Sequence, residues 1–203
     1  MGMSAEIIHI GQKNMDAILP ILLIPLWGEG GGAEASVRLR WEGNTLFVRF
    51  MVSEPQLRRM TSEHNQAVWE DSCVEVFLQR EGADEYVNVE CSASTKMLVA
   101  RGTSRCNRQH YPVEFIQTIP LTITILENSN ARSRWRADLE LDLVALGLMK
   151  GDERMEDVRL RGNFYKCGDK LDEPHYLAAA EIMTSAPDFH RSEYFIPMSF
   201  TDR

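Results

Sequence analysis

The stretch that decides the fold is Val68–Leu78, which reads Val-Trp-Glu-Asp-Ser-Cys-Val-Glu-Val-Phe-Leu. From Cys73 onward the side chains alternate with the period of two that is typical of a β-strand, so that Val74, Val76 and Leu78 share one face. That face is purely aliphatic. We therefore expect it to pack against a hydrophobic core.

The opposite face of the same strand has a different chemistry. It carries Glu75, and Trp69 lies just before the strand begins. An indole can stack on a ring while a carboxylate hydrogen-bonds to its substituents, so the pair predicts a site for a polar cyclic ligand such as a sugar. The alternative is that Trp69 packs in the core or at a sheet edge, as most tryptophans do.

Alternation of this kind recurs along the chain. Val37–Trp41 and Leu46–Val52 flank a Glu-Gly-Asn-Thr turn and predict a hairpin. Phe115–Leu126 predicts a long strand, whereas the polar segment 55–66 is compatible with one or two helical turns. In all we expect about ten short strands and almost no long helix, which indicates a single all-β domain over residues 1–203, folded as an antiparallel sandwich or barrel.

Composition excludes several classes of function. The net charge of −8, from 22 basic and 30 acidic residues, argues against nucleic acid as a partner because phosphate backbones would be repelled. We expect no membrane span, since no apolar run approaches the roughly 18 residues that one requires. Without a secretory signal, the chain as written predicts a cytoplasmic protein, or an extracellular or periplasmic one if a leader was removed. The sequence does not indicate an oligomeric state.

A row of polar side chains adds to the candidate site. Asn88 and Glu90 alternate on one predicted strand, and Arg161 and Asn163 alternate on another. If these strands share a sheet with Glu75, its outer face offers the donors and acceptors that sugar hydroxyls need. The alternative is an ordinary solvent-facing sheet surface, where such residues are common neighbours.

Two further readings concern an aromatic loop and a pair of acids. Phe189, in the loop Pro-Asp-Phe-His, has no periodic reason for its position and is either a second aromatic wall or a plug over an open edge. Glu75 and Glu90 on adjacent strands can also form the carboxylate pair of a glycoside hydrolase, although no apolar pocket around either acid is visible in the sequence.

Metal chemistry is weakly indicated. The five histidines and four cysteines lack the spacing of a metal site. The acidic loop with Asp169, Asp172 and Glu173 offers oxygen ligands, but it lacks the order of a calcium loop and is expected to be solvated. No metal ligands are therefore assigned.

Taken together, these motifs resemble the family 9 carbohydrate-binding modules, and more closely their family 9-like branch. The resemblance rests on Trp-Glu-Asp-Ser-x-Val-Glu-Val-Phe from Trp69, Tyr-x-Asn-x-Glu ending at Glu90, Arg-Gly-Asn-Phe-Tyr from Arg161, and the loop around Phe189. It runs from about Trp27 to Phe200, nearly the whole chain.

The resemblance implies a jelly-roll-like β-sandwich without catalytic machinery of its own. It implies binding of a glucan or xylan chain in support of polysaccharide degradation, with Trp69 and Glu75 matching a stacking tryptophan and a sugar-binding glutamate. The family's second tryptophan falls near Phe189, and the aspartate expected two residues before the first tryptophan is Ala67 here. The resemblance also implies a structural calcium. Some related sandwich domains hold haem, for which the ten methionines offer axial ligands, and a protein ligand is a further alternative.

Overall fold

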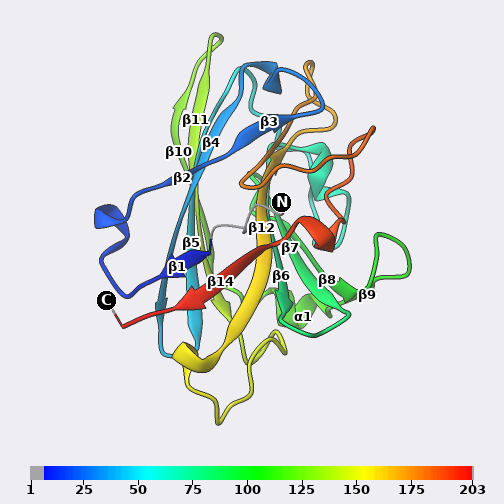
Figure 1. The fold of residues 1–203 in the computed structure, drawn as a ribbon. Coiled ribbons are helices and arrows are strands. Elements are labelled where there is room, and N and C mark those ends of the chain that lie inside the picture. The colour runs from blue at the N-terminus through cyan, green and yellow to red at the C-terminus, as the bar shows by residue number, and fades with distance from the viewer. Residues whose placement is uncertain (1–6, 203) are drawn as a thin grey trace.

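The computed structural model, which describes residues 7–202, is a sandwich of two β-sheets (Figure 1). The larger sheet has nine strands in the order β1-β14-β12-β6-β7-β8-β9, and β13 pairs with both β12 and β3. Its strands are β1 (Ile8–Ile10), β3 (Ile24–Leu26), β6 (Cys73–Arg80), β7 (Tyr86–Ser92), β8 (Met97–Gly102), β9 (Gln109–His110), β12 (Arg159–Cys167), β13 (Tyr176–Ala178) and β14 (Ile196–Phe200).

The smaller sheet has five strands in the order β10-β11-β5-β4-β2. They are β2 (Ile21–Leu22), β4 (Glu34–Glu42), β5 (Thr45–Glu54), β10 (Leu121–Asn128) and β11 (Ser133–Asp142). The predicted hairpin is confirmed as β4 and β5, with Trp41 opposite Leu46. Among the described strands, all pairings are antiparallel except that of β1 with β14.

The predicted β-sandwich is confirmed, with fourteen strands in residues 7–202 where the sequence predicts about ten. The additional strands β1, β2, β3 and β9 contain only two or three residues each. Such short segments do not reveal an alternating pattern, so they were not predictable from periodicity.

In the part of the chain that the structure describes, helical structure is confined to short turns. They are α1 (Val113–Ile116) and the 3₁₀ helices η1 (Met15–Ala17), η2 (Gly30–Gly32), η3 (Val68–Glu70), η4 (Met155–Asp157) and η5 (Ser192–Tyr194). The predicted strand Phe115–Leu126 is wrong at its start: α1 and a turn come first, and β10 begins only after Pro120, which cannot donate to a sheet. Segment 55–66 forms no helix. In residues 7–202, no helix is long and apolar enough to cross a membrane.

The main hydrophobic core lies between the sheets. As predicted, Val74, Val76 and Leu78 of β6 point into it, and each is at most 1% exposed. Trp41 and Trp135 contribute from the smaller sheet. The aliphatic face of Val68–Leu78 therefore packs in the core, as its pattern predicted.

The opposite face of the larger sheet is covered rather than open to solvent. β6 and β7 are buried along almost their full length on both faces. A second hydrophobic cluster, which includes Phe77 and Phe189, joins that face to β3 and to the C-terminal segment 179–195, drawn in orange and red (Figure 1). The strands of the predicted polar row do share one sheet, but the alternative of an ordinary solvent-facing surface is wrong, because covering segments far away in sequence bury most of that face.

Charged side chains also lie between the sheets. Glu54 of β5 and Lys166 of β12 are fully buried, and their side chains form an ion pair of 2.9 Å. The Trp135 indole donates a 2.6 Å hydrogen bond to Glu54, and His175 Nε2 lies 2.8 Å from Lys166 Nζ. Burial acts to raise the pKa of Glu54, but the Lys166 ammonium and the neighbouring polar groups outweigh it and lower the pKa to about 2. We call these four residues the inter-sheet node.

Candidate functional site

A cavity of about 640 Å³ opens on the covered face of the larger sheet. Strands β6, β7 and β8, the loop before β9, the loop after β12 and the C-terminal segment all contribute to it. Its lining residues are Trp69, Glu75, Asn88, Glu90, Leu98, Arg105, Asn107, Arg108, His110, Cys167, Asp169, Tyr176, Pro187, Asp188, Phe189 and His190.

The floor of the cavity consists of two facing carboxylic acids. Glu75 of β6 and Glu90 of β7 are directly opposite each other in the antiparallel pair and are 3% and 5% exposed. The Asn88 amide donates a 2.8 Å hydrogen bond to Glu90 Oε1. Within the described chain, the second oxygen, Oε2, is buried and has no hydrogen-bond partner. A buried acceptor left in this way is available to a ligand donor.

Both acids are held away from their usual ionisation. Burial raises the pKa of Glu90 to about 7, opposed by the Asn88 hydrogen bond and by Arg108. Burial also raises the pKa of Glu75 well above its usual value, with further contributions from Cys167 and Glu90. Since the two acids are cross-strand partners, they titrate as a coupled pair.

Arg108 fixes the edge of this floor. Its Nε donates to Asn88 Oδ1 at 2.8 Å, and its Nη2 donates to the Tyr86 carbonyl oxygen at 2.9 Å. The guanidinium also lies 4.2 Å from the centre of the Tyr86 ring. The Asn88 amide is thereby oriented to donate to Glu90, and a positive charge borders the cavity.

Trp69 borders the cavity from the short helix η3 and is 37% exposed. The loop after β12 holds this helix by its backbone: the Asp169 N–H donates to the Trp69 carbonyl at 3.1 Å, and the Lys170 N–H donates to the Glu70 carbonyl at 3.2 Å. An ion pair of 2.9 Å between Lys170 and Glu70 reinforces the contact. The indole is therefore presented on a fixed turn.

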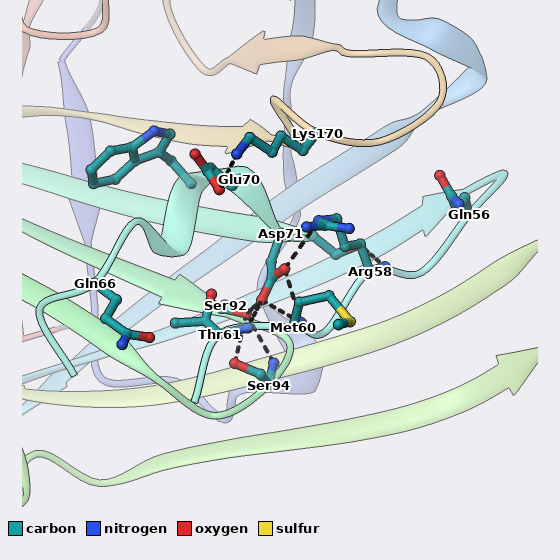
Figure 2. A network of polar contacts seen from close by, with 12 residues as sticks. Gln56, Arg58, Met60, Thr61, Gln66, Glu70, Asp71, Ser92, Ser94 and Lys170 are labelled. Atoms are coloured by element: carbon teal, nitrogen blue, oxygen red, sulfur yellow. Dashed lines mark hydrogen bonds and ion pairs between the residues drawn. The ribbon is translucent and has the colours of Figure 1, made fainter. Parts of the chain in front are cut away.

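Asp71 anchors the other side of that turn (Figure 2). Its carboxylate, only 1% exposed, accepts hydrogen bonds from the Met60 and Thr61 N–H groups and from the Ser92 hydroxyl. Although burial acts to raise the pKa of Asp71, the Thr61 and Met60 hydrogen bonds lower it overall. Asp71 thereby fixes segment 55–66.

Phe189 lines the cavity from the C-terminal segment, yet it is largely used in packing. It is 8% exposed, and its ring stacks on Tyr165 with a centroid distance of 4.1 Å. Trp27 packs on it at 5.8 Å. Next to it, His190 Nδ1 lies 2.8 Å from the Tyr86 hydroxyl, and burial together with Arg108 lowers the His190 pKa to about 3. His190 is therefore a neutral hydrogen-bonding group.

Four of the six predicted site residues border the cavity: Trp69, Glu75, Glu90 and Phe189. Arg161 and Asn163 do not. The Asn163 side chain is fully buried against the Ala180 backbone, and Arg161 donates to the Phe195 carbonyl. They share the face of Glu75, as expected from alternation, but they lie further along the sheet, where segment 179–195 covers them.

Several lining residues were not assigned to the site from sequence. Arg108, Tyr176 and His190 come from loops or short strands whose approach to β7 depends on the tertiary fold. Asn88 and Asp169 carried signals, since one belongs to the polar row and the other to the acidic loop. What no pattern revealed is that these segments meet around one cavity.

The one group of converging His, Cys, Asp or Glu ligand atoms among the described residues does not fit the calcium that the resemblance implies. In residues 7–202, the group of three or more acidic, histidine or cysteine side chains with converging ligand atoms is Cys73, Glu75 and Cys167. Calcium takes six to eight oxygen ligands, and two thiols are unsuited to it. Asp169, from the predicted oxygen-rich loop, instead lines the cavity.

A two-sheet sandwich with an aromatic wall and a polar floor is the architecture of a carbohydrate-binding module. The model of carbohydrate-binding family 9 matches residues 29–200. The chain belongs to this family. No curated protein matches the chain.

Solved structures share the fold. A protein from Bacteroides uniformis ATCC 8492, described as a candidate carbohydrate-binding protein, has a TM-score of 0.81 at 25% identity, covering 96% of this chain and 97% of its own. A family 9 module from Caldicellulosiruptor kristjanssonii in complex with cellotriose has a TM-score of 0.64 at 11% identity, covering 98% and 95%. The glucose complex of such a module from that organism has a TM-score of 0.60 at 12% identity, covering 98% and 97%.

Proposed function

We propose that the cavity binds a glucan- or xylan-type oligosaccharide without cleaving it, in support of polysaccharide degradation. The observation that carries the proposal is that the exposed indole of Trp69 and the unpartnered Glu90 Oε2 border the same cavity. Family membership supports a carbohydrate ligand. The family 9 structures with cellotriose and glucose support a ligand built from glucose-like units.

The proposed binding mode follows from the chemistry of the lining. A sugar ring has a C–H-rich face that packs on an indole, and hydroxyls at its edge that both donate and accept. Trp69 takes the ring face, Glu90 Oε2 accepts from a hydroxyl, and Arg105 and Arg108 supply cationic donors at the rim. The cavity volume lies within the range of small-molecule sites.

Isothermal titration with glucose, cellotriose and xylotriose tests this proposal. We expect Trp69→Ala to weaken binding by about 2 kcal/mol, or roughly 30-fold, because truncating a central aromatic contact typically has that effect. The matched control is Phe47→Ala, which removes an aromatic ring under Arg40 on the smaller sheet, away from the cavity. The control should bind like the wild type.

Equal affinities of Trp69→Ala and wild type would remove Trp69 from the site. Failure of the wild type to bind any of the three sugars would refute the proposal for glucan- and xylan-type ligands. Arg161→Ala adds a second control, since Arg161 lies outside the cavity lining and should leave the affinity unchanged.

The raised pKa values of Glu75 and Glu90 favour a second candidate, a glycoside hydrolase. Hydrolysis needs one acid to protonate the leaving oxygen while the other acts at the anomeric carbon, so the two acids flank the scissile bond. Here Glu75 Oε1 already accepts a hydrogen bond from the Cys167 thiol, and both acids are at most 5% exposed, which favours binding over cleavage. Release of reducing sugar that is lost in Glu75→Gln would reverse this preference.

The haem alternative has less support. No methionine is among the described residues that line the cavity. A Soret band in the purified protein would nevertheless establish haem binding directly.

A further inference from the structure

Two cysteines lie side by side beneath the cavity. Cys73 opens β6 and Cys167 ends β12, and the two are direct partners in the antiparallel pair between these strands. Both are free thiols and at most 1% exposed. Opposite residues on one face of such a pair have Cβ atoms only about 5 Å apart. The sheet thus sets their separation.

Glu75 brings a third donor to the same point. The Cys167 thiol donates a 3.0 Å hydrogen bond to Glu75 Oε1. The two sulfurs and a carboxylate oxygen of Glu75 all lie within 4.8 Å of one another. In a tetrahedral zinc site, with bonds of about 2.3 Å to sulfur and 2.0 Å to oxygen, ligand atoms are separated by roughly 3.5 Å. Small side-chain movements suffice to reach that geometry.

We propose that Cys73, Cys167 and Glu75 bind a thiophilic divalent cation, with zinc as the best match. Two sulfurs and one oxygen favour zinc over calcium or magnesium, which prefer all-oxygen sites. The three donors come from two neighbouring strands of one sheet, so the site is rigid before the ion arrives. The inference stands independently of sugar binding.

The site has an open side and a route for the ion. Cys167 and Glu75 line the cavity, whereas Cys73 lies behind them. Three protein ligands leave a fourth tetrahedral position, and the cavity lined by Glu75 and Cys167 can supply water or a ligand oxygen to it. On coordination the thiol and carboxyl protons pass to the buffer, so two thiolates and one carboxylate face the ion.

Charge supports the same assignment. With a divalent ion the three ligands carry a net charge of −1, and the Arg105 and Arg108 side chains line the same cavity as Glu75 and Cys167. Without an ion, two thiols and a carboxylic acid share a buried site in which Glu90 is the cross-strand partner of Glu75. A cation therefore relieves the repulsion that ionised groups would otherwise experience there.

Cobalt titration of the full chain, kept reduced and freed of metal, is the direct test. We expect one Co²⁺ per chain, an intense near-ultraviolet thiolate-to-cobalt absorbance, and displacement by one equivalent of Zn²⁺. Cys73→Ala and Cys167→Ala should lose the absorbance and weaken zinc binding by at least about 10- to 100-fold. The matched control Cys106→Ala, which removes an exposed thiol, should behave as wild type.

Zinc X-ray absorption of the wild type provides a measurement that needs no variant. Two sulfur scatterers with oxygen completing the shell are expected, and a shell of nitrogen and oxygen alone would overturn the proposal. So would absence of the thiolate absorbance, or its persistence in the Cys73→Ala/Cys167→Ala double variant. Loss of two free thiols with a mass decrease of two hydrogens in the untreated protein would show a Cys73–Cys167 disulfide instead. Sugar titrations are run separately, so that failure of metal binding can be distinguished from failure of sugar binding.

Discussion

Two groups of buried carboxylic acids in this protein have pKa values that are shifted in opposite directions. In the inter-sheet node, Glu54 is paired with Lys166, and its pKa falls to about 2. At the cavity floor, Glu75 and Glu90 face each other, and the pKa of Glu90 rises to about 7. Burial acts in the same direction on both, so the difference comes from the partner supplied. A paired acid stabilises the fold, whereas an unpaired one at a cavity is left for a ligand.

The largest expected effect comes from breaking the node. Lys166→Met leaves the Glu54 charge buried without its cation, and we expect the free energy of unfolding to fall by about 3–5 kcal/mol. Urea denaturation measures the loss. The double variant Glu54→Gln/Lys166→Met should recover much of the stability because no buried charge remains. A loss below about 1 kcal/mol in the single variant would contradict the role assigned to the pair.

The second effect is acid sensitivity. Because the pKa of Glu54 is about 2 in the folded chain and 4.5 ordinarily, the folded state binds fewer protons than the unfolded state between these values. The stabilisation is complete above pH 4.5 and is lost as the pH falls toward 2, by about 3 kcal/mol. Denaturation series from pH 6 to 2 should show this loss reduced in Glu54→Gln/Lys166→Met. Identical slopes in both proteins would assign the acid sensitivity to other groups.

The smallest expected effect concerns Glu90 at the cavity floor, where the free energy of unfolding changes with pH in the opposite direction. The raised pKa of Glu90 means that the folded state retains a proton that the unfolded state releases between pH 4.5 and 7. Stability therefore decreases as pH rises through this window. Glu90→Gln cannot ionise, so it should exceed the wild type by roughly 1–3 kcal/mol at pH 8 and match it near pH 4. The exposed Glu81→Gln is the control, and a stability gain equal at both pH values would contradict the ionisation argument.

The features that could be predicted from the sequence are those that depend on the alternation of side chains along a strand. The sequence assigned the aliphatic face of β6 to the core and brought Trp69, Glu75 and Glu90 together, because strand period and nearest-neighbour pairing are local rules. It failed for Arg161 and Asn163, which obey the same period. Whether a polar face meets solvent, a cavity or a covering segment depends on residues 179–195, whose path over the sheet leaves no periodic trace.

The cavity wall also shows why loops were hard to assign. Arg108 reaches the site by hydrogen bonds to β7, and Asp169 by pairing its backbone with Trp69. Both contacts join segments separated by many residues, and neither depends on the hydrophobic pattern. Charged loop residues of this kind are identified only when the fold shows where the loop lies.

The backbone pairing of residues 169–170 with η3 has a consequence for how the cavity performs. Because the turn carrying Trp69 is tied on one side by this loop and on the other by Asp71, little conformational freedom of the main chain is left to lose when a guest docks. We therefore expect the cavity to bind as a rigid receptor, with an association rate limited by diffusion and by the orientation of the ligand. Differences in affinity among competing ligands are therefore expected mainly in their dissociation rates.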